Sequence, residues 1–273
     1  MSERVFNHPE RLFPPDPAVR KIAASLYEGV RDLPIVSPHG HTDPSWFALN
    51  ERFPDAVDLL IKPDHYVYRM LYSQGMSMES LGVPTTDGSS LETDSRKIWH
   101  VFASHFYLFA GTPSRMWLDH VFNDVFGIDV PLSEDTADQY FEHINEQLAT
   151  PEFRPRALFD RFNIETLATT ESPLDSLEHH RKIREGDWNG NVITTYRPDP
   201  VADPDFEGFR ENVELFGELA GEDISNWEGY LAAHRERRSF FRTMGATATD
   251  HGHPSALTAD LPRADCEALY AKA

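Results

Sequence analysis

Two histidines separated by a single residue are the first feature of this sequence that could do chemistry. His39 and His41 lie in the stretch IVSPHGHTD, residues 35–43, where a short apolar run ends in polar residues. In an extended strand alternate side chains point to the same face, so the two imidazoles are expected side by side. Neutral imidazole is a common ligand of zinc and similar ions, and the pair therefore predicts half of a metal site. The same short pattern could also be a solvated turn that happens to hold two histidines.

Two further polar clusters follow later strand-like stretches. One contains Arg197 and Asp199, and the other contains Asp250, His251 and His253. Each cluster alone could be an exposed turn. Their recurrence after successive predicted strands favours one shared site, because polar groups gathered at the carboxyl ends of parallel strands are typical of barrel active sites.

Three side chains in and beyond these clusters suggest a particular reaction chemistry. Arg197 has a planar fork that binds a carboxylate through two parallel hydrogen bonds, so it predicts a substrate that carries a carboxylate. Tyr66 follows His65 directly, and a tyrosine beside a histidine near a metal could act as a general acid or base. Alternatively, Tyr66 packs its ring and leaves its hydroxyl at the surface.

The elements that must position these residues alternate between strand and helix in the second half of the chain. Strands are predicted over 35–39, 164–170, 191–196 and 245–249. Helices are predicted over 17–30, 65–72, 95–109, 113–127, 133–148, 205–219, 226–243 and 264–272. Another predicted helix is opened by Ser172-Pro173 and holds His179 and His180. Alternation of this kind implies parallel βαβ units. About four strands are present, whereas a (β/α)8 barrel needs about eight.

The region between the first two strands contains helices and almost no strand signal. Residues 44–162 are therefore predicted to be a helical insertion of about 120 residues, much longer than an ordinary βα loop. A stretch of this length beside a metal half-site suits a lid or a substrate-binding subdomain.

Composition excludes several classes of protein. The formal net charge of −20 over 273 residues makes nucleic acid and anionic membranes poor partners. Cys266 is the single cysteine, which excludes an internal disulfide and a cysteine-based zinc site. No apolar stretch is long enough to span a bilayer, and the beginning MSERVFNHPE is too polar for a signal peptide. These features predict a cytoplasmic protein.

Five motifs together resemble the uronate isomerase (glucuronate isomerase) family of the amidohydrolase superfamily, over essentially the whole chain. They are SPHGHTDPSWFA, PDHYVYRMLYSQG, FRPRALFDRFNIETLATT, TYRPD and FFRTMGATATDHGHP. The resemblance implies a distorted (β/α)8 barrel with a divalent metal, zinc being the first expectation. It also implies interconversion of D-glucuronate with D-fructuronate, and of D-galacturonate with D-tagaturonate.

The resemblance also implies roles for individual residues. His39 and His41 match the metal-binding pair after the first strand. Arg197 matches the arginine of the RPD motif, expected to hold the carboxylate of the sugar acid, and Asp250 matches the acid after the fourth strand. Asp250 would bind substrate hydroxyl groups or help to open the sugar ring.

The match of His65 and Tyr66 to the His-Tyr pair of the family gives these residues a catalytic role. Conversion of an aldose to a ketose needs a proton taken from C2, a cis-enediol intermediate and protonation at C1. One group within hydrogen-bond reach of both carbons can do this. Tyr66 is the predicted acid and base, and His65 is expected to assist it and to bind substrate.

The family pattern continues with a histidine and a metal-binding aspartate after later strands, which this sequence lacks. Residues 1–273 are therefore expected to be the N-terminal portion of one (β/α)8 domain, with doubtful activity alone. The expected partner is a uronate sugar acid, with homo-oligomers for the full-length enzyme. A metal-dependent hydrolase of the same superfamily, with Asp250 as ligand or base, is the alternative function. A non-catalytic half-barrel that serves only in assembly or binding is the third.

Overall fold

The computed structural model describes residues 7–252 and 257–273, which divide into two compact units. One unit contains Glu51–Leu158 together with the described residues up to Leu33, and the other contains Pro34–Asn50 and Phe159–Ala273. Each unit has its own packing and is described by itself. The predicted assignment of 44–162 as an insertion within a larger barrel domain stays a prediction.

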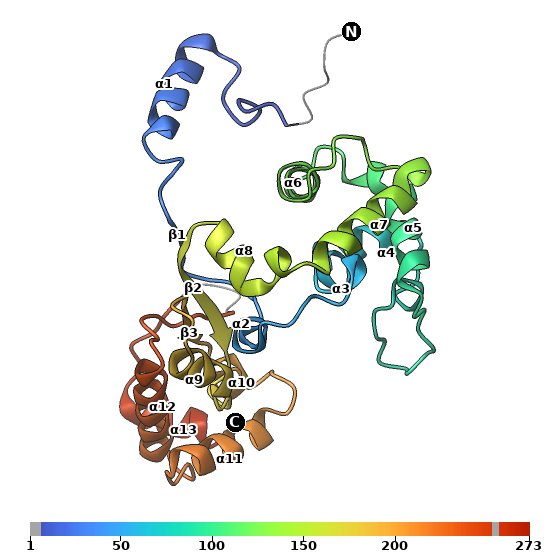
Figure 1. Ribbon diagram of the computed structural model, residues 1–273. Coiled ribbons are helices and arrows are strands. Elements are labelled where there is room, and N and C mark those ends of the chain that lie inside the picture. The colour runs from blue at the N-terminus through green and yellow to red at the C-terminus, as the bar shows by residue number, and fades with distance from the viewer. Residues whose placement is uncertain (1–6, 253–256) are drawn as a thin grey trace. The chain divides into compact units, whose positions relative to one another are not determined.

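The second unit is built on a small parallel sheet of three strands in the order β1-β2-β3 (Figure 1). The strands are β1 (Ile35–Ser37), β2 (Ile164–Glu171) and β3 (Asn191–Tyr196). Their β-branched residues suit a pleated sheet covered by helices. The predicted α/β class with parallel strands is therefore confirmed, and β2 and β3 lie where the sequence placed them. Strand β1 is shorter than expected and ends before the two histidines.

The fourth predicted strand does not form as a strand. Within the described residues, the segment 245–249 contributes one isolated parallel bridge, between Thr249 and Tyr196. The backbone of Tyr196 donates to the carbonyl of Ala248 and accepts from the N–H of Asp250. Small side chains in this segment bury little apolar area, and Gly245 at a φ of 96° begins it in a conformation outside the strand region. The bridge nevertheless places Asp250 beside the end of β3.

Helices α2, α9, α10, α11, α12 and α13 complete the second unit. Their bounds are α2 (Pro44–Leu49), α9 (Glu178–Glu185), α10 (Asp199–Ala202), α11 (Phe209–Ala220), α12 (Trp227–Thr243) and α13 (Arg263–Tyr270), while α8 (Pro155–Arg161) precedes β2 in the chain.

The prediction that Ser172-Pro173 opens the helix of α9 is wrong. Ser172 instead accepts a hydrogen bond from the N–H of Leu174, and the turn continues until Asp175 accepts from the N–H of Leu177.

Alternation along β2 and β3 gives the sheet two different faces. Leu167 and Val192 pack with Ile183 of α9. Residues two positions apart along a strand share a face, so every second residue counted from Leu167 or Val192 also faces the helices. Tyr196 on that face is buried against Phe241 of α12. The intervening residues point to the opposite face, toward the site described below.

The first unit is helical around an aromatic core. Its elements are α1 (Pro17–Glu28), α3 (Ala56–Leu60), α4 (His65–Tyr72), η1 (Glu79–Leu81), α5 (Ser95–Ser104), η2 (Phe106–Phe109), α6 (Pro113–His120), η3 (Val121–Val125), η4 (Glu134–Thr136), α7 (Ala137–Leu148) and η5 (Pro151–Phe153). The indole of Trp99 is fully buried and donates to the carbonyl of Ala137, which fastens α5 to α7. Phe102, Phe106 and Phe122 pack around it, so apolar burial holds these short helices together.

Several helix starts are those that the sequence predicts. Asp16 caps α1 by accepting from the N–H of Val19, with Pro17 at the first helical position. Thr112 caps α6 in the same way, again followed by a proline. In the part of the chain that the structure describes, no helix has both the length and the apolar character needed to cross a membrane.

Candidate active site

The two histidines of the HGH stretch converge, although a loop and not a strand brings them together. His39 and His41 lie between β1 and α2, with their Nε2 atoms 3.2 Å apart. Their rings meet edge to face, with centroids 4.9 Å apart. The expected pairing of the imidazoles is therefore present, but its cause is the turn that follows Ser37.

Contacts on both sides of the histidines fix this loop. The hydroxyl of Thr170 on β2 donates to the carbonyl of Gly40 at 3.0 Å. A β-carbon at Gly40 would lie 3.4 Å from the carbonyl oxygen of Ala168, so glycine lets the loop lie close against β2. Asp43 caps α2 by accepting from the N–H of Ser45, and this acid therefore has a structural use.

Arg197 and Asp250 lie next to each other and next to the histidine pair. Arg197 follows β3, and its N–H donates to the carbonyl of Glu171 at the end of β2. Its Nη1 lies 3.4 Å from Oδ2 of Asp250, and the same oxygen lies 3.5 Å from Nδ1 of His39. Three residues from three separate connections thus meet at the carboxyl ends of the strands, as the sequence predicted.

Asp199 is the strongest partner of the arginine. Its Oδ2 accepts from Nε of Arg197 at 2.7 Å, and both of its oxygens lie within 3.1 Å of the N–H of Gly252. Burial opposes ionisation of this carboxyl. The hydrogen bonds from Arg197 and Gly252 outweigh that effect and lower the pKa of Asp199 below its ordinary value.

The nitrogen donors fit a bound divalent cation. Zinc takes imidazole nitrogen at about 2.0–2.1 Å in tetrahedral geometry, which separates two such nitrogens by about 3.3 Å. The 3.2 Å between the Nε2 atoms of His39 and His41 matches this separation. Oδ2 of Asp250 is buried and accepts no hydrogen bond from any described residue, so it also has a lone pair to offer. Among the described residues no cluster of three or more His, Cys, Asp or Glu that could hold a metal ion forms, and the assignment of the pair as metal ligands stays a prediction.

His65 and Tyr66 lie at the start of α4 in the first unit. Asp64 caps this helix by accepting from the N–H of Tyr66 at 2.8 Å. The two rings are 4.3 Å apart, and the side chain of Tyr66 is 68% exposed. An exposed hydroxyl at a helix start is accessible to a substrate, and the predicted acid–base role of the pair stays a prediction.

The end of β2 carries a buried polar pair whose partnership the sequence did not reveal. Glu171 accepts from the hydroxyl of Thr194, and its Oε2 lies 3.8 Å from Nε2 of His180 on α9. The same imidazole nitrogen lies 2.8 Å from the hydroxyl of Thr169. Burial raises the pKa of Glu171 to about 7 and lowers the pKa of His180 to about 4, so the pair is held close to neutrality. These groups face the helices and not the histidine pair.

The predicted constellation also included His251 and His253. His251 places Nε2 at 3.0 Å from the hydroxyl of Thr249. His253 lies outside the described residues.

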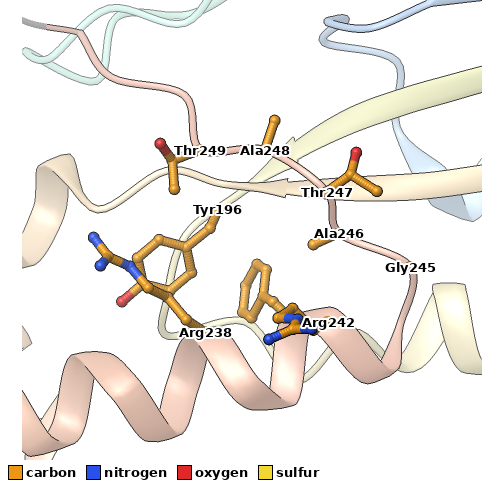
Figure 2. A pocket seen from close by; sticks show the side chains of 9 residues that line it. Tyr196, Arg238, Arg242, Gly245, Ala246, Thr247, Ala248 and Thr249 are labelled. Atoms are coloured by element: carbon orange, nitrogen blue, oxygen red, sulfur yellow. The ribbon is translucent and has the colours of Figure 1, made fainter.

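A cavity of about 780 Å³ lies beside the segment 245–249 but does not include the candidate catalytic residues. Figure 2 shows three of the side chains that line it. Tyr196 extends from the end of β3, Arg238 of α12 lies beside its ring, and Arg242 lies further along the same helix. Cζ of Arg238 lies 5.4 Å from the centre of the Tyr196 ring. The residues that line the cavity include neither an imidazole nor a carboxylate.

Comparison with known proteins gives concordant matches in sequence and in structure. A family model described as glucuronate isomerase matches residues 18–273. A uronate isomerase of Phenylobacterium zucineum (strain HLK1) is 59% identical over 97% of this chain and 55% of its own length. One from Sphingopyxis alaskensis (strain DSM 13593 / LMG 18877 / RB2256) is 59% identical over 100% of this chain and 58% of its own.

Solved structures agree with the sequence matches. The crystal structure of glucuronate isomerase from Caulobacter crescentus superposes with a TM-score of 0.93 at 58% identity, covering 97% of this chain and 55% of the other. Uronate isomerase from Thermotoga maritima gives a TM-score of 0.81 at 33% identity, covering 92% of this chain and 54% of the other. The chain thus spans about half the length of the relatives that it matches.

Proposed function

The chain belongs to the glucuronate isomerase family, and from this premise we propose that its strand-end loops serve the isomerisation of uronate sugars. The proposed reaction converts D-glucuronate to D-fructuronate, with D-galacturonate and D-tagaturonate as a second pair. The observation that carries the proposal is the contact of Asp250 with both Arg197 and His39. This contact supports a site in which a side chain suited to carboxylate binding lies beside the proposed metal-binding pair.

Arg197 is the proposed anchor of the sugar carboxylate. Asp199 accepts from its Nε and Asp250 lies 3.4 Å from its Nη1, so the remaining N–H groups of Nη1 and Nη2 are the donors proposed for a substrate carboxylate. About a third of the side chain, 33%, is exposed. A carboxylate bound by these donors lies close to Asp250, which is then able to accept hydrogen bonds from the sugar hydroxyl groups.

We propose that His39 and His41 hold a divalent metal, with zinc as the first candidate. Two observations support this assignment. The Nε2 atoms of the two histidines converge, and the buried Oδ2 of Asp250 accepts no hydrogen bond from the described residues. When bound, such an ion supplies a positive centre that stabilises negative charge on substrate oxygens. Oδ2 of Asp250 lies 3.5 Å from Nδ1 of His39, close enough for a carboxylate to favour a cation bound at that imidazole.

Proton transfer is assigned to Tyr66 with the help of His65. In the proposed step the deprotonated oxygen of Tyr66 takes the proton from C2 and returns it to C1, while the proton of the C2 hydroxyl moves to O1, so that a cis-enediol connects the aldose and the ketose. Close approach of the two rings and the exposure of Tyr66 support this role. Asp250 is the proposed partner for ring opening or for the substrate hydroxyl groups.

The finer architecture is also a proposal, namely the N-terminal portion of a (β/α)8 barrel. Sequential parallel order β1-β2-β3 and the further parallel bridge at Thr249 support it. Polar side chains at the carboxyl ends of the strands are arranged as in barrel enzymes.

Deuterium incorporation tests the proposed reaction. D-glucuronate incubated with the chain in D₂O should exchange its C2 hydrogen, as followed by NMR. Tyr66→Phe should abolish the exchange while leaving the binding of glucuronate measurable. Exchange that continues undiminished in this variant removes Tyr66 from the acid–base role, and binding without any exchange in the unmodified chain contradicts the isomerisation.

A metal-dependent hydrolase is the second candidate, favoured by the buried oxygen of Asp250 that accepts no hydrogen bond from the described residues. Asp250 would then act as a base toward water. This alternative predicts hydrolysis of an amide or a lactone and no exchange at C2. The same deuterium experiment therefore separates the two functions.

A further inference from the structure

Asp199 connects the two segments that carry Arg197 and Asp250. Its carboxylate is 16% exposed and receives Nε of Arg197 at 2.7 Å on one side. On the other side it receives the N–H of Gly252, at 3.1 Å to Oδ1 and 3.0 Å to Oδ2. One carboxylate thus holds the side chain that follows β3 and the backbone that follows the Thr249 bridge.

The geometry at the guanidinium limits what Asp199 can do. Because it bonds to Nε, it fixes the plane of the fork without occupying the Nη1–Nη2 edge. Oδ2 of Asp250 lies 3.4 Å from Nη1. Asp199 therefore orients Arg197 through Nε and leaves the N–H groups of Nη1 and Nη2 to other acceptors.

Gly252 shows how closely the two segments approach. A β-carbon at this position would lie 2.9 Å from Nη2 of Arg197 and 2.9 Å from Oδ2 of Asp199. Any side chain here would displace the guanidinium or its acceptor. The contact between the segments depends on a backbone donor that has no side chain.

We propose that Asp199 is a positioning residue of the site: it orients Arg197 for the sugar carboxylate and fixes the segment of Asp250 beside it. The inference rests on the proposed function for the identity of the ligand. It adds a residue that acts through others and touches no substrate. Removing its carboxylate should weaken substrate binding through Arg197 and not through a general loss of folding.

A double-mutant cycle on the full chain tests this. Asp199→Ala should raise the Kd or KM for D-glucuronate about 10-fold or more, the scale of a lost hydrogen bond to a charged group. In an Arg197→Ala background the same change should have a clearly smaller effect, because only the hold of Asp199 on the Gly252 segment is left to lose. If Asp199→Ala raises the Kd or KM by the same factor in both backgrounds, the proposal is overturned. Asp205→Asn, on an exposed aspartate of the following loop, is the control for the lost charge.

A second readout does not depend on activity. The ¹⁵N-labelled chain should show an Nε–H signal of Arg197 that is shifted and protected by the carboxylate acceptor. Asp199→Asn should move this signal and speed its exchange with water, while Asp205→Asn leaves it in place. An unmoved signal overturns the positioning role whatever the chain binds. Failure of the unmodified chain to bind glucuronate, with the signal behaving as expected, instead overturns the proposed function.

Discussion

The guanidinium of Arg197 meets two carboxylates with different tasks. Asp199 bonds to Nε at 2.7 Å, while Asp250 lies 3.4 Å from Nη1 and also faces His39. Only a guanidinium group can make this arrangement, because the two carboxylates approach different nitrogens of the same planar group. The site at residue scale is therefore a set of directed hydrogen-bond donors and not simply a patch of charge.

Arg197→Lys tests the need for the fork. Lysine keeps the positive charge but cannot bond to Asp199 and to a substrate carboxylate in parallel. Binding of D-glucuronate should weaken by about 10- to 100-fold, as expected for lost hydrogen bonds to a charged group. Titration calorimetry measures this, with Arg210→Lys on the exposed side of α11 as the control. Equal affinity in the two variants would contradict the anchoring role.

Glu171 gives a prediction about pH. Its pKa of about 7 in the folded chain lies above the ordinary value of 4.5, so folding favours its protonated form. The stability that it contributes is complete below about pH 4.5 and is lost as the pH rises through about 7. Glu171→Gln removes this loss, and the variant should be more stable than the unmodified chain at about pH 8.5, by on the order of 3 kcal/mol or less.

Urea unfolding at acidic and alkaline pH measures the effect of Glu171→Gln. His180 acts in the opposite direction, because its lowered pKa of about 4 makes stability fall as the pH drops from about 6.5 toward 4. The comparison is therefore clearest above pH 7, where His180 is neutral in both states. If the glutamine variant is less stable than the unmodified chain at about pH 8.5, burial is not the dominant influence on Glu171.

Sequence reasoning reached some of these residues and not others. Arg197 and Asp250 could be placed together because the carboxyl ends of parallel strands meet at one edge. The partnership of Glu171 with His180 could not be predicted, because it depends on how α9 packs against the sheet. Asp199 was visible as part of an RPD motif, but its contact with Gly252 requires the fold of a distant segment.

At the scale of elements, the strongest signals were caps and β-branched runs. Asp16 and Thr112, each followed by proline, begin α1 and α6 as predicted. Strand 245–249 was the weakest expectation, since small residues offer little area to pack and only a bridge forms among the described residues. Local side-chain chemistry thus decides a helix start, whereas a strand needs a neighbour to pair with.

Arg237 links elements that are distant in the sequence. Its buried guanidinium donates to the carbonyls of Pro173 at 2.8 Å and Asp175 at 2.7 Å, which ties α12 to the turn after β2. Arg237→Ala should lower the free energy of unfolding by about 2–4 kcal/mol, because two buried carbonyls lose donors and a cavity remains. Urea unfolding measures this against Arg235→Ala, an exposed arginine of the same helix. Similar losses in both variants would contradict the linking role.

At the scale of the whole molecule, charge is the dominant feature. Forty-five acidic residues oppose 25 basic residues, which gives a formal net charge of −20. The proposed substrate, an anionic sugar acid, would approach against this field, so local donors such as Arg197 would have to supply the attraction. The same excess of negative charge disfavours the compact chain through self-repulsion.

Salt should therefore stabilise the folded chain. Raising NaCl from about 20 to about 200 mM shortens the screening length to below about 10 Å and weakens repulsion between distant carboxylates. The free energy of unfolding should rise by on the order of 1 kcal/mol, the scale of a few exposed charge interactions. Urea midpoints at the two concentrations measure it, with KCl to exclude a sodium-specific effect. A fall in the midpoint would mean that the surface ion pairs outweigh the repulsion.

The space available to a β-carbon at Gly252 bears on how mutational scans of this chain are interpreted. A replacement at position 252 should displace the ends of the Arg197 and Asp199 side chains, since these atoms lie only 2.9 Å from where the first side-chain carbon would stand. A saturation library would score it like a residue that handles substrate, although it offers only a main-chain N–H. A loss of activity on substitution of Gly252 would reflect the close approach of Arg197 and Asp199. A ranking of residues by mutational sensitivity alone would therefore count this glycine among the residues that contact substrate.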